Sequence, residues 1–280
     1  MKDKISEHLS KPLYNQSLDD IADYSDSGFT KKLHLDKHIS RRFNEELEQI
    51  RTLVIEMGAL VSKQVDDGLS ALLTANIQLA EQVIERDNHV NAMELNIDEF
   101  CTKILARRQP AASDLRLIVS VIKTITDLER IGDEAVKFGK NAIKLSKGDF
   151  ADNEGERPLI ELKHLGHHIS NTLNRALIAY AKMDIDEALA IIKDDNIVDE
   201  EFDNISRLLV TKMMENPREI KNALRVTWCA RALERIGDHT TNLCEYIVYL
   251  VEGKDVRHST IEQIKAKMSN TRFMSAVQCE

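Results

Sequence analysis

Two copies of one short motif hold the acidic residues with the clearest potential for chemistry. The stretch LERIGDEA begins at position 128, and LERIGDHT begins at position 233. Each copy places a glutamate four residues before an aspartate, Glu129 with Asp133 and Glu234 with Asp238. On a helix, side chains at i and i+4 lie one turn apart on one face, where two like charges repel each other. The pairing therefore suggests a bound cation that offsets the repulsion.

The same motif places a carboxylate among apolar residues. At about 100° per residue, Glu129 falls within the apolar arc of its helix, where loss of hydration costs several kcal/mol unless the charge is paired, neutralised or coordinated. Gly132 and Gly237 each cost a helix interior about 1 kcal/mol relative to alanine, which close approach of a neighbouring helix can offset. Both features favour a cation held between helices.

A second pair of segments supplies more oxygen ligands. The sequences DNHVN and DNIVD place Asp87 with Asn91, and Asp195 with Asp199, again at i and i+4. Two antiparallel helices can therefore present four oxygen atoms across one groove, a ligand set that favours Mg, Mn, Ca or iron over zinc or copper. The alternative is a solvated acidic face screened by neighbouring arginines, and the repetition of the pattern favours the metal site.

The two copies differ in charge. Asp199 in the second copy corresponds to Asn91 in the first. Further along the motif helices, the second copy has oxygen-bearing side chains where the first has lysines, namely Asn242 and Glu245 against Lys137 and Lys140. The sequence therefore predicts that the second-half site binds metal more tightly.

The elements that must position these residues are all helical. Apolar residues recur at i, i+3, i+4 and i+7, which predicts helices over 38–74, 77–107, 112–147, 158–182, 185–215 and 218–252. No segment shows the alternation of a strand. The predicted fold class is all-α.

An internal repeat organises these helices. Residues from Met57 align with those from Leu165 at an offset of 108, and the motifs align at an offset of 105. The sequence predicts two tandem three-helix bundles, at 36–148 and 158–256, flanked by a polar N-terminal extension at 1–35 and a polar tail at 257–280. The first helix is longer at its start, and its apolar spacing predicts packing on the other half or on a second subunit.

Composition and the catalytic motifs that are missing argue against several classes of function. The formal net charge is 38 − 47 = −9, which disfavours nucleic acid as a ligand. The four cysteines form no CxxC pair, and the sequence shows no signal peptide or membrane span, so we expect a cytoplasmic protein. No nucleophile elbow, phosphate loop or HExxH motif is present, and only one Glu-x-x-His occurs, at 161–164, where a di-iron oxidase needs two. We expect no enzyme activity.

At these residues the sequence resembles the PhoU family of bacterial phosphate regulators. The family hallmark, Glu/Asp-x-x-x-Asp on the third helix of each bundle, is matched by Glu129 with Asp133 and by Glu234 with Asp238. The resemblance runs from about Leu35 to His258 and includes RQPAASDLRL and CEYIVYLVEGKDVRH. The first 34 residues lie outside it.

The resemblance implies a negative regulator of phosphate uptake and phosphate-starvation signalling. It implies a homodimer whose carboxylates hold metal ions, divalent or ferric (Mg, Mn or Fe). It implies two partners, the ATPase subunit of the phosphate ABC transporter and the sensor histidine kinase of the phosphate regulon, with membrane association through those partners. The alternatives are a carboxylate-bridged metal oxidase, which would turn over oxygen, and a purely structural helical scaffold, which would need no carboxylates.

Overall fold

The computed structural model describes residues 41–110, 112–146, 157–257, 259 and 262–264. Its main elements are α4 (Arg41–Leu73), α5 (Ile77–Arg108), α6 (Ala112–Ser146), α7 (Arg157–Lys182), α8 (Ile185–Glu215), the 3-10 helix η3 (Pro217–Glu219) and α9 (Ile220–Glu252). No strand occurs among the described residues, which confirms the all-α class. The predicted N-terminal extension and most of the predicted C-terminal tail lie outside the described residues. Among those described, we find no helix with the length and apolarity of a membrane span.

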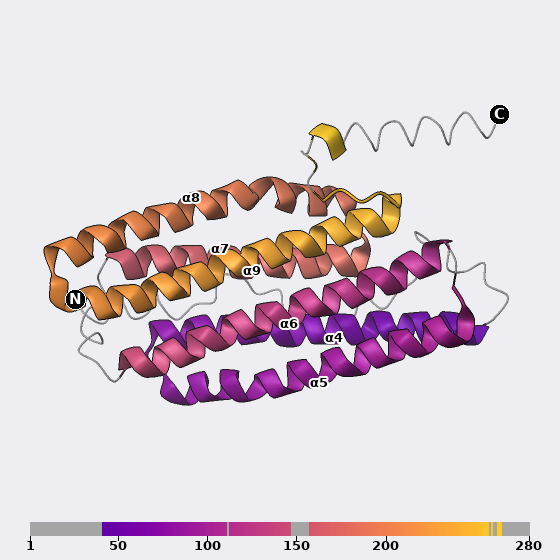
Figure 1. The fold of residues 1–280 in the computed structure, drawn as a ribbon, viewed down its shortest axis with the longest axis horizontal. Coiled ribbons are helices and arrows are strands. Elements are labelled where there is room, and N and C mark those ends of the chain that lie inside the picture. Colours follow the sequence, from indigo (N-terminus) through magenta and orange to yellow (C-terminus); the bar gives the residue numbers. More distant parts are fainter. Residues whose placement is uncertain (1–40, 111, 147–156, 258, 260–261, 265–280) are drawn as a thin grey trace, which may run out of the picture.

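The helices pack as two groups of three that share a core. Figure 1 shows α4, α5 and α6 along one side and α7, α8 and α9 along the other, with α6 beside α9 at the centre. The α4–α7 contact joins the two groups a second time. Buried apolar residues from both halves form one continuous cluster, so neither half has a separate core.

The turn that follows the first helix of each half is repeated. Ala75 and Met183 occupy equivalent positions and both have φ of 50°. The next residues cap the following helices, because Asn76 accepts a hydrogen bond from the Leu79 N–H and Asp184 accepts one from the Glu187 N–H. The repeat therefore extends to backbone conformation and capping.

The α4–α7 contact shows how the halves are related. A Cβ added to Gly58 on α4 would lie 2.6 Å from Leu177 on α7, and one added to Gly166 on α7 would lie 2.5 Å from Leu69 on α4. These contacts interchange when each residue is replaced by its repeat equivalent. Two hydrogen bonds interchange in the same way, Ser62 Oγ to Asn174 Oδ1 and Ser170 Oγ to Asp66 Oδ1. An approximate twofold rotation therefore relates the halves.

The extended start of α4 packs on the other half. Leu47, Ile50 and Val54 are buried. The Arg51 guanidinium donates a hydrogen bond through Nη2 to the carbonyl oxygen of Ala181, 2.9 Å away at the end of α7. Of the two expectations for this extension, the structure shows contact with the second half.

One ion pair recurs in both halves with its charges exchanged. In the first half, Asp67 on α4 accepts from Arg86 Nη1 on α5 at 2.7 Å. In the second half, the equivalent positions hold Arg175 on α7 and Asp194 on α8, whose Nη1 and Oδ2 atoms lie 3.8 Å apart. The acid therefore lies on the first helix of the first half but on the second helix of the second half, and the arginine is placed the opposite way.

Candidate functional site

The first groove lies where α5 and α4 approach the glycine of the first motif. A Cβ added to Gly132 would lie 3.4 Å from Asp87 Oδ1, from Gln64 Oε1 and from Val90 Cγ1. Because glycine has no side chain, α6 leaves room for these oxygen atoms beside the motif. Asp87 from α5 and the motif acids from α6 therefore meet at one place.

Hydrogen bonds fix two amide side chains in the first groove. Asp87 accepts from Gln64 Nε2 at 3.2 Å and from Asn91 Nδ2 at 3.4 Å. Gln64 Nε2 also donates to the Val83 carbonyl oxygen at 3.2 Å, which sets the orientation of the Gln64 amide. Gln64 Oε1 and Asn91 Oδ1 are buried and accept no hydrogen bond from the described residues. Two oxygen acceptors are thus left for a cation or water.

The carboxylates of the first groove destabilise one another's charges. Burial raises the pKa of Glu129, and the charges of Asp133, Glu94 and Asp87 raise it further. Burial also raises the pKa of Glu94, with a contribution from Asp98. Glu94 was not among the predicted ligands because its repeat equivalent is Phe202, and comparison of the halves finds only what both share.

In the second groove, an arginine side chain already contacts the buried glutamate. Glu234 is 8% exposed, and its Oε1 accepts from Arg231 Nη1 at 2.8 Å. Its Oε2 atom has no hydrogen-bond partner among the described residues. Burial and the charge of Asp238 raise the pKa of Glu234, and burial and Asp199 raise that of Asp238. The predicted acids of α8 and α9 therefore act on one another.

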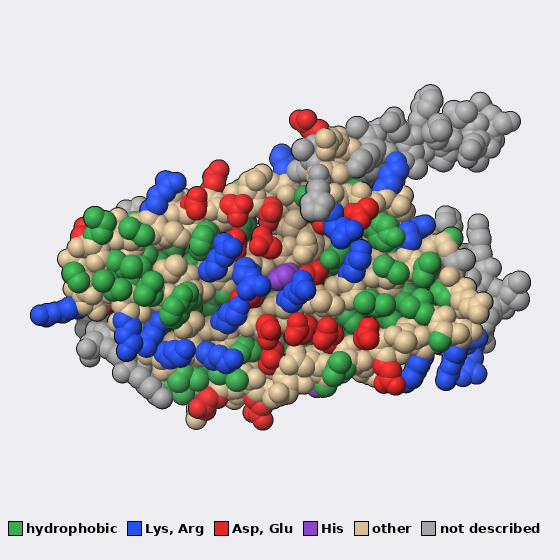
Figure 2. Space-filling model, in the orientation of Figure 1, with side chains coloured by type: hydrophobic (Ala, Val, Ile, Leu, Met, Phe, Trp, Pro, Cys, Tyr) green, Lys and Arg blue, Asp and Glu red, His purple; other side chains and the backbone are tan. Residues whose placement is uncertain are grey.

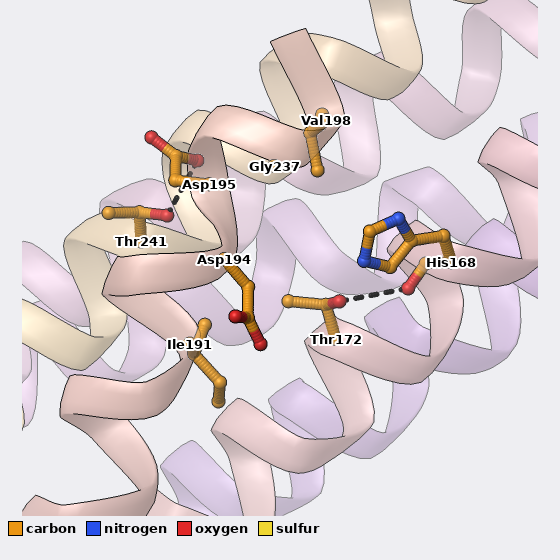
Figure 3. Close-up of a pocket in the computed structure, with 8 residues that line it drawn as sticks. All are labelled: His168, Thr172, Ile191, Asp194, Asp195, Val198, Gly237 and Thr241. Atoms are coloured by element: carbon orange, nitrogen blue, oxygen red, sulfur yellow. Dashed lines mark hydrogen bonds between the residues drawn. The ribbon is translucent and has the colours of Figure 1, made fainter. Parts of the chain in front are cut away.

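Asp195 lies at the edge of a small cavity in the second half. Thr241 Oγ1 donates to Asp195 Oδ1 at 3.0 Å, and Figure 3 shows the two side chains together. Burial raises the pKa of Asp195, and Asp238 and Asp199 add to the rise. The cavity measures ≈ 10 Å³, roughly the room that one water needs. Its residues are His168, Thr172, Ile191, Asp194, Asp195, Val198, Gly237 and Thr241.

Thr172 is one of the short side chains that line this cavity. It is the repeat equivalent of Gln64, whose longer side chain reaches Asp87 in the first half. Figure 3 shows the shorter Thr172 bonded to the carbonyl oxygen of His168 on its own helix, one turn earlier. The contact that Gln64 makes with Asp87 in the first groove is therefore not repeated by Thr172 in the second.

Asn242 and Lys137 supported the prediction that the second-half site binds metal more tightly, but neither side chain lies in a groove. Asn242 Nδ2 lies 3.4 Å from Asp127 Oδ1 on α6, and Lys137 Nζ lies 2.5 Å from Glu134 Oε2. Four residues advance a helix by about 40° beyond a full turn, which carries both positions away from the motif aspartates and toward the α6–α9 contact. The expectation that Lys137 faces the first groove is therefore wrong, and the relative metal affinity of the two sites stays a prediction.

Glu245 and Lys140, the other two residues behind that prediction, lie further along α9 and α6. Glu245 is half-buried beside Tyr246, whose pKa is raised by burial, by its hydrogen bond to Asp127 and also by the charge of Glu245. Lys140 is exposed. Neither brings a charge that the structure places among the motif acids.

Sequence reasoning missed the polar contacts between α6 and α9. Asp127 is 3% exposed and lies 2.8 Å from His239 Nδ1, while Tyr246 Oη donates to its other oxygen at 2.7 Å. Glu134, also buried, pairs with Arg235 Nη1 at 2.5 Å. We call these contacts the seam. The arginine of the second motif thus bridges the two halves.

Charged side chains on the surface follow the positions of the two grooves and the seam. Figure 2 shows acidic side chains gathered on both sides of a central band of lysine and arginine side chains, with a histidine at its middle. Arg130, Arg235 and Lys137, which lie beside the seam acids, are exposed, as is Arg231, which pairs with Glu234. Asp127 and Glu134 are buried. A basic band therefore separates the two acidic grooves.

The donor set of each groove fits a hard cation, but the side chains have not converged on one point. Carboxylate and amide oxygens are the ligands that Mg²⁺, Mn²⁺, Ca²⁺ and iron accept. Among the described residues, no three His, Cys, Asp or Glu side chains form a ready-made metal site. Binding would require rotamer changes on α5 with α6, and on α8 with α9.

Comparison with known proteins agrees with this architecture. A family model described as the PhoU domain matches residues 54–142 and 162–247. A Pseudomonas putida protein named phosphate-specific transport system accessory protein PhoU homolog is 48% identical over 245 residues, 88% of this chain and 94% of that protein. The Escherichia coli accessory protein PhoU is 48% identical over 227 residues, 81% of this chain and 92% of that protein.

Solved structures give the same result. The crystal structure of PhoU from Pseudomonas aeruginosa has a TM-score of 0.72 at 49% identity, covering 76% of this chain and 100% of that one. The phosphate transport system regulatory protein PhoU from Streptococcus pneumoniae has a TM-score of 0.69 at 27% identity, covering 76% of this chain and 99% of that one. By sequence and by fold, this chain belongs to the PhoU family.

Proposed function

We propose that this protein is a negative regulator of phosphate uptake and phosphate-starvation signalling. The observation that carries the proposal is the match to relatives named as accessory proteins of the phosphate-specific transport system over more than nine-tenths of their length. The Streptococcus pneumoniae relative is named as a regulatory protein of the phosphate transport system, which supports a regulatory role. The role is non-enzymatic, because the proposed mechanism depends on contact between proteins.

The two grooves are the proposed metal sites. The first would use Glu129 and Asp133 from α6 with Asp87, Asn91 and Glu94 from α5. The second would use the following residues of α9 and α8: Glu234, Asp238, Asp195 and Asp199. A bound ion would offset the repulsion that raises the pKa of Glu129 and Glu234, beyond the effect of burial, and would tie the second helix of each half to the third. We propose Mg, Mn or iron as the ion, because the donors are hard oxygen atoms.

The proposed partners are the ATPase subunit of the phosphate transporter and the sensor histidine kinase of the phosphate regulon. The protein would act as a homodimeric adaptor in the cytoplasm, holding the kinase silent while the transporter reports supply. Metal-tied helices would give both partners a fixed surface. In this scheme the protein reaches the membrane face through its partners.

Deletion and complementation test the proposal. Deleting the gene should leave phosphate-starvation genes expressed in rich phosphate, and the wild-type gene should restore repression. A variant with Glu129, Asp133, Glu234 and Asp238 all changed to alanine should remain helical, lose metal by elemental analysis and fail to restore repression. Normal repression in the deletion strain would contradict the regulatory role. Full rescue by a metal-free variant would contradict the metal part alone.

A further inference from the structure

Exposed apolar side chains gather at one end of the second half. Val210 and Met214 lie one turn apart near the end of α8, and Ile220, Leu224 and Trp228 follow one another by single turns at the start of α9. Met214 is 79% exposed and Trp228 is 55% exposed. Figure 2 shows apolar side chains gathered at this end of the molecule, on the left, and a second group near the right-hand end. We call these five residues the end patch. Exposed apolar clusters of this kind mark interaction surfaces.

Basic residues surround the end patch. Arg225 Nη1 donates to the Lys144 carbonyl oxygen at 3.0 Å, which places the end of α6 beside the start of α9. Lys140, Lys144 and Lys221 are exposed there. Residues 205–228 carry five Lys or Arg and two Asp or Glu, and residues 137–146 carry three Lys and no acid, so the local charge is 8 − 2 = +6. The whole chain has a net charge of −9.

The fold does not require this surface, because the equivalent end of the first half lacks it. The repeat equivalents of the end patch are Thr102, Ala106, Leu115, Val119 and Lys123. Residues 97–123 carry five basic and three acidic residues, and residues 242–251 carry one acid and no base, so the local charge is 5 − 4 = +1. The repeat supplies the same helices at both ends, but the end of the second half has five exposed large apolar side chains and a local charge of +6, whereas among the five equivalent positions only Leu115 is a large apolar side chain of that exposure and the local charge is +1.

We propose that the end patch docks directly on an anionic lipid bilayer. Exposed aromatic and aliphatic side chains next to lysine and arginine are the composition of surfaces that bind the headgroup region, where apolar side chains enter the acyl boundary and basic side chains contact phosphate groups. Trp228 suits that boundary because its indole is apolar with one polar N–H. Lysines at the end of α6 can extend their long stems toward the headgroups.

A lipid surface fits the charge distribution of this end better than a folded partner does. The basic residues come from four separate elements, α6, α8, η3 and α9, and many of them are exposed. A fluid layer of negative headgroups can meet dispersed positive charges without a fixed pairing of side chains. Contact at this end would lay the tips of α6, α8 and α9 on the membrane and keep the acidic grooves away from it.

Trp228 makes the proposal directly testable, because it is the single tryptophan of the chain. The full-length protein is mixed with vesicles of phosphatidylcholine, with and without phosphatidylglycerol. We expect co-sedimentation and a shift of Trp228 emission to shorter wavelength only with the anionic lipid. The binding should be lost at about 1 M salt, where the screening length falls to about 3 Å.

A pair of repeat-equivalent variants provides the control. Ile220 is 40% exposed and Leu115 is 42% exposed, each in the first turns of its helix. Ile220→Asp should weaken vesicle binding by about tenfold, because it removes an inserted side chain and adds a negative charge. Leu115→Asp should leave binding unchanged. Lys140→Glu combined with Lys144→Glu should weaken binding without changing the melting temperature.

Four outcomes would overturn the proposal. These are unchanged Trp228 emission with anionic vesicles, equal weakening by the two aspartate variants, an emission shift that depends on protein concentration in the absence of lipid, and a shift caused by the soluble transporter ATPase without lipid. The third would show that a second copy of the chain covers the end patch. The fourth would show that the partner protein does.

Discussion

The first and second grooves hold equal numbers of carboxylates but differ in what surrounds them. The first brings together Asp87, Glu94, Glu129 and Asp133, and the second brings together Asp195, Asp199, Glu234 and Asp238. Arg231 enters the second groove, where it pairs with Glu234 and lies over the ring of Phe202 at 5.7 Å. The first half has Thr126 and Glu94 at the positions equivalent to Arg231 and Phe202. The two halves have thus kept the same number of carboxylates, with Glu94 in one groove and Asp199 in the other, while the basic residue beside them differs.

The seam shows the same kind of divergence. Asp127 and Glu134 are both buried in α6, but their partners differ in exposure. His239 is buried beside Asp127, whereas Arg235 and Lys137 beside Glu134 are each 46% exposed. The repeat equivalent of Asp127 is Ala232, so this contact exists on one side of the twofold only. Burial of the partner should decide what each carboxylate contributes to stability.

The largest effect we predict comes from breaking the seam. Asp127→Ala should lower the free energy of unfolding by about 3 kcal/mol, because it leaves the buried His239 and the half-buried Tyr246 donors without their acceptor. Glu134→Ala should cost about 1 kcal/mol, since its two partners can turn to water. Urea unfolding of both variants measures the difference. Equal losses would show that partner burial does not control the energy of these contacts.

The next effect concerns metal affinity. With Lys137 on the seam and Arg231 in the second groove, the first groove is the more negative, which reverses the order expected from sequence. Arg231→Thr should raise the Mn²⁺ affinity of the second groove by about tenfold, roughly the effect of one nearby unit charge in a partly buried site. Thr126→Arg should lower the affinity of the first groove.

Calorimetric titration of metal-free protein measures both changes. Glu129→Ala with Asp133→Ala leaves only the second groove for study, and Glu234→Ala with Asp238→Ala leaves only the first. An Arg231→Thr variant whose second groove binds no more tightly would show that the arginine turns away when metal arrives.

The helices and the motif pairs could be predicted from sequence because both follow from periodicity and repetition. Apolar spacing set the helix bounds to within three residues at the described ends, and the last helix starts later than expected because Pro217 opens a 3-10 turn. Glu94, Gln64 and Asp127 were missed for one reason. Their repeat equivalents are Phe202, Thr172 and Ala232, so comparing the halves removes them from view.

The orientation of α6 against α9 could not be predicted in the same way. Whether Lys137 and Asn242 face a groove or the seam depends on helix rotations of a few tens of degrees, which packing of both halves decides. A single helical wheel contains no information about the neighbouring helix. This is why the charges on the motif helices were assigned to the wrong surface.

The smallest predicted effect is a pH dependence of the metal-free protein. Burial and neighbouring acids hold the pKa of Glu234 above its ordinary value of 4.5 and that of Asp238 above 3.8. A carboxyl whose pKa is higher in the folded state than in the unfolded state favours folding when it is protonated. This contribution is therefore absent at neutral pH and appears as pH falls through the raised pKa.

Neutral isosteres test this dependence. Glu234→Gln with Asp238→Asn should raise neutral-pH stability by about 0.5 kcal/mol, since it removes an i, i+4 repulsion. The same variant should flatten the gain that the wild type shows as the pH falls from neutral toward the ordinary carboxyl pKa. Urea midpoints in the presence of a chelator measure both, with Asp203→Asn on the exposed face of α8 as the control. A variant that is less stable than wild type at neutral pH would show that Arg231 more than offsets the repulsion.

The exchanged ion pairs bear on how a duplicated chain assembles. During folding, α4 meets two similar candidates, its own neighbour α5 and the copy α8, and α7 meets the same two. Correct pairing sets Asp67 against Arg86 and Arg175 against Asp194. Exchanged pairing would set aspartate against aspartate and arginine against arginine, which like-charge repulsion disfavours. The direction of one partly buried ion pair thus distinguishes the equivalent helices of the two halves, which favours pairing of each helix with its own neighbour.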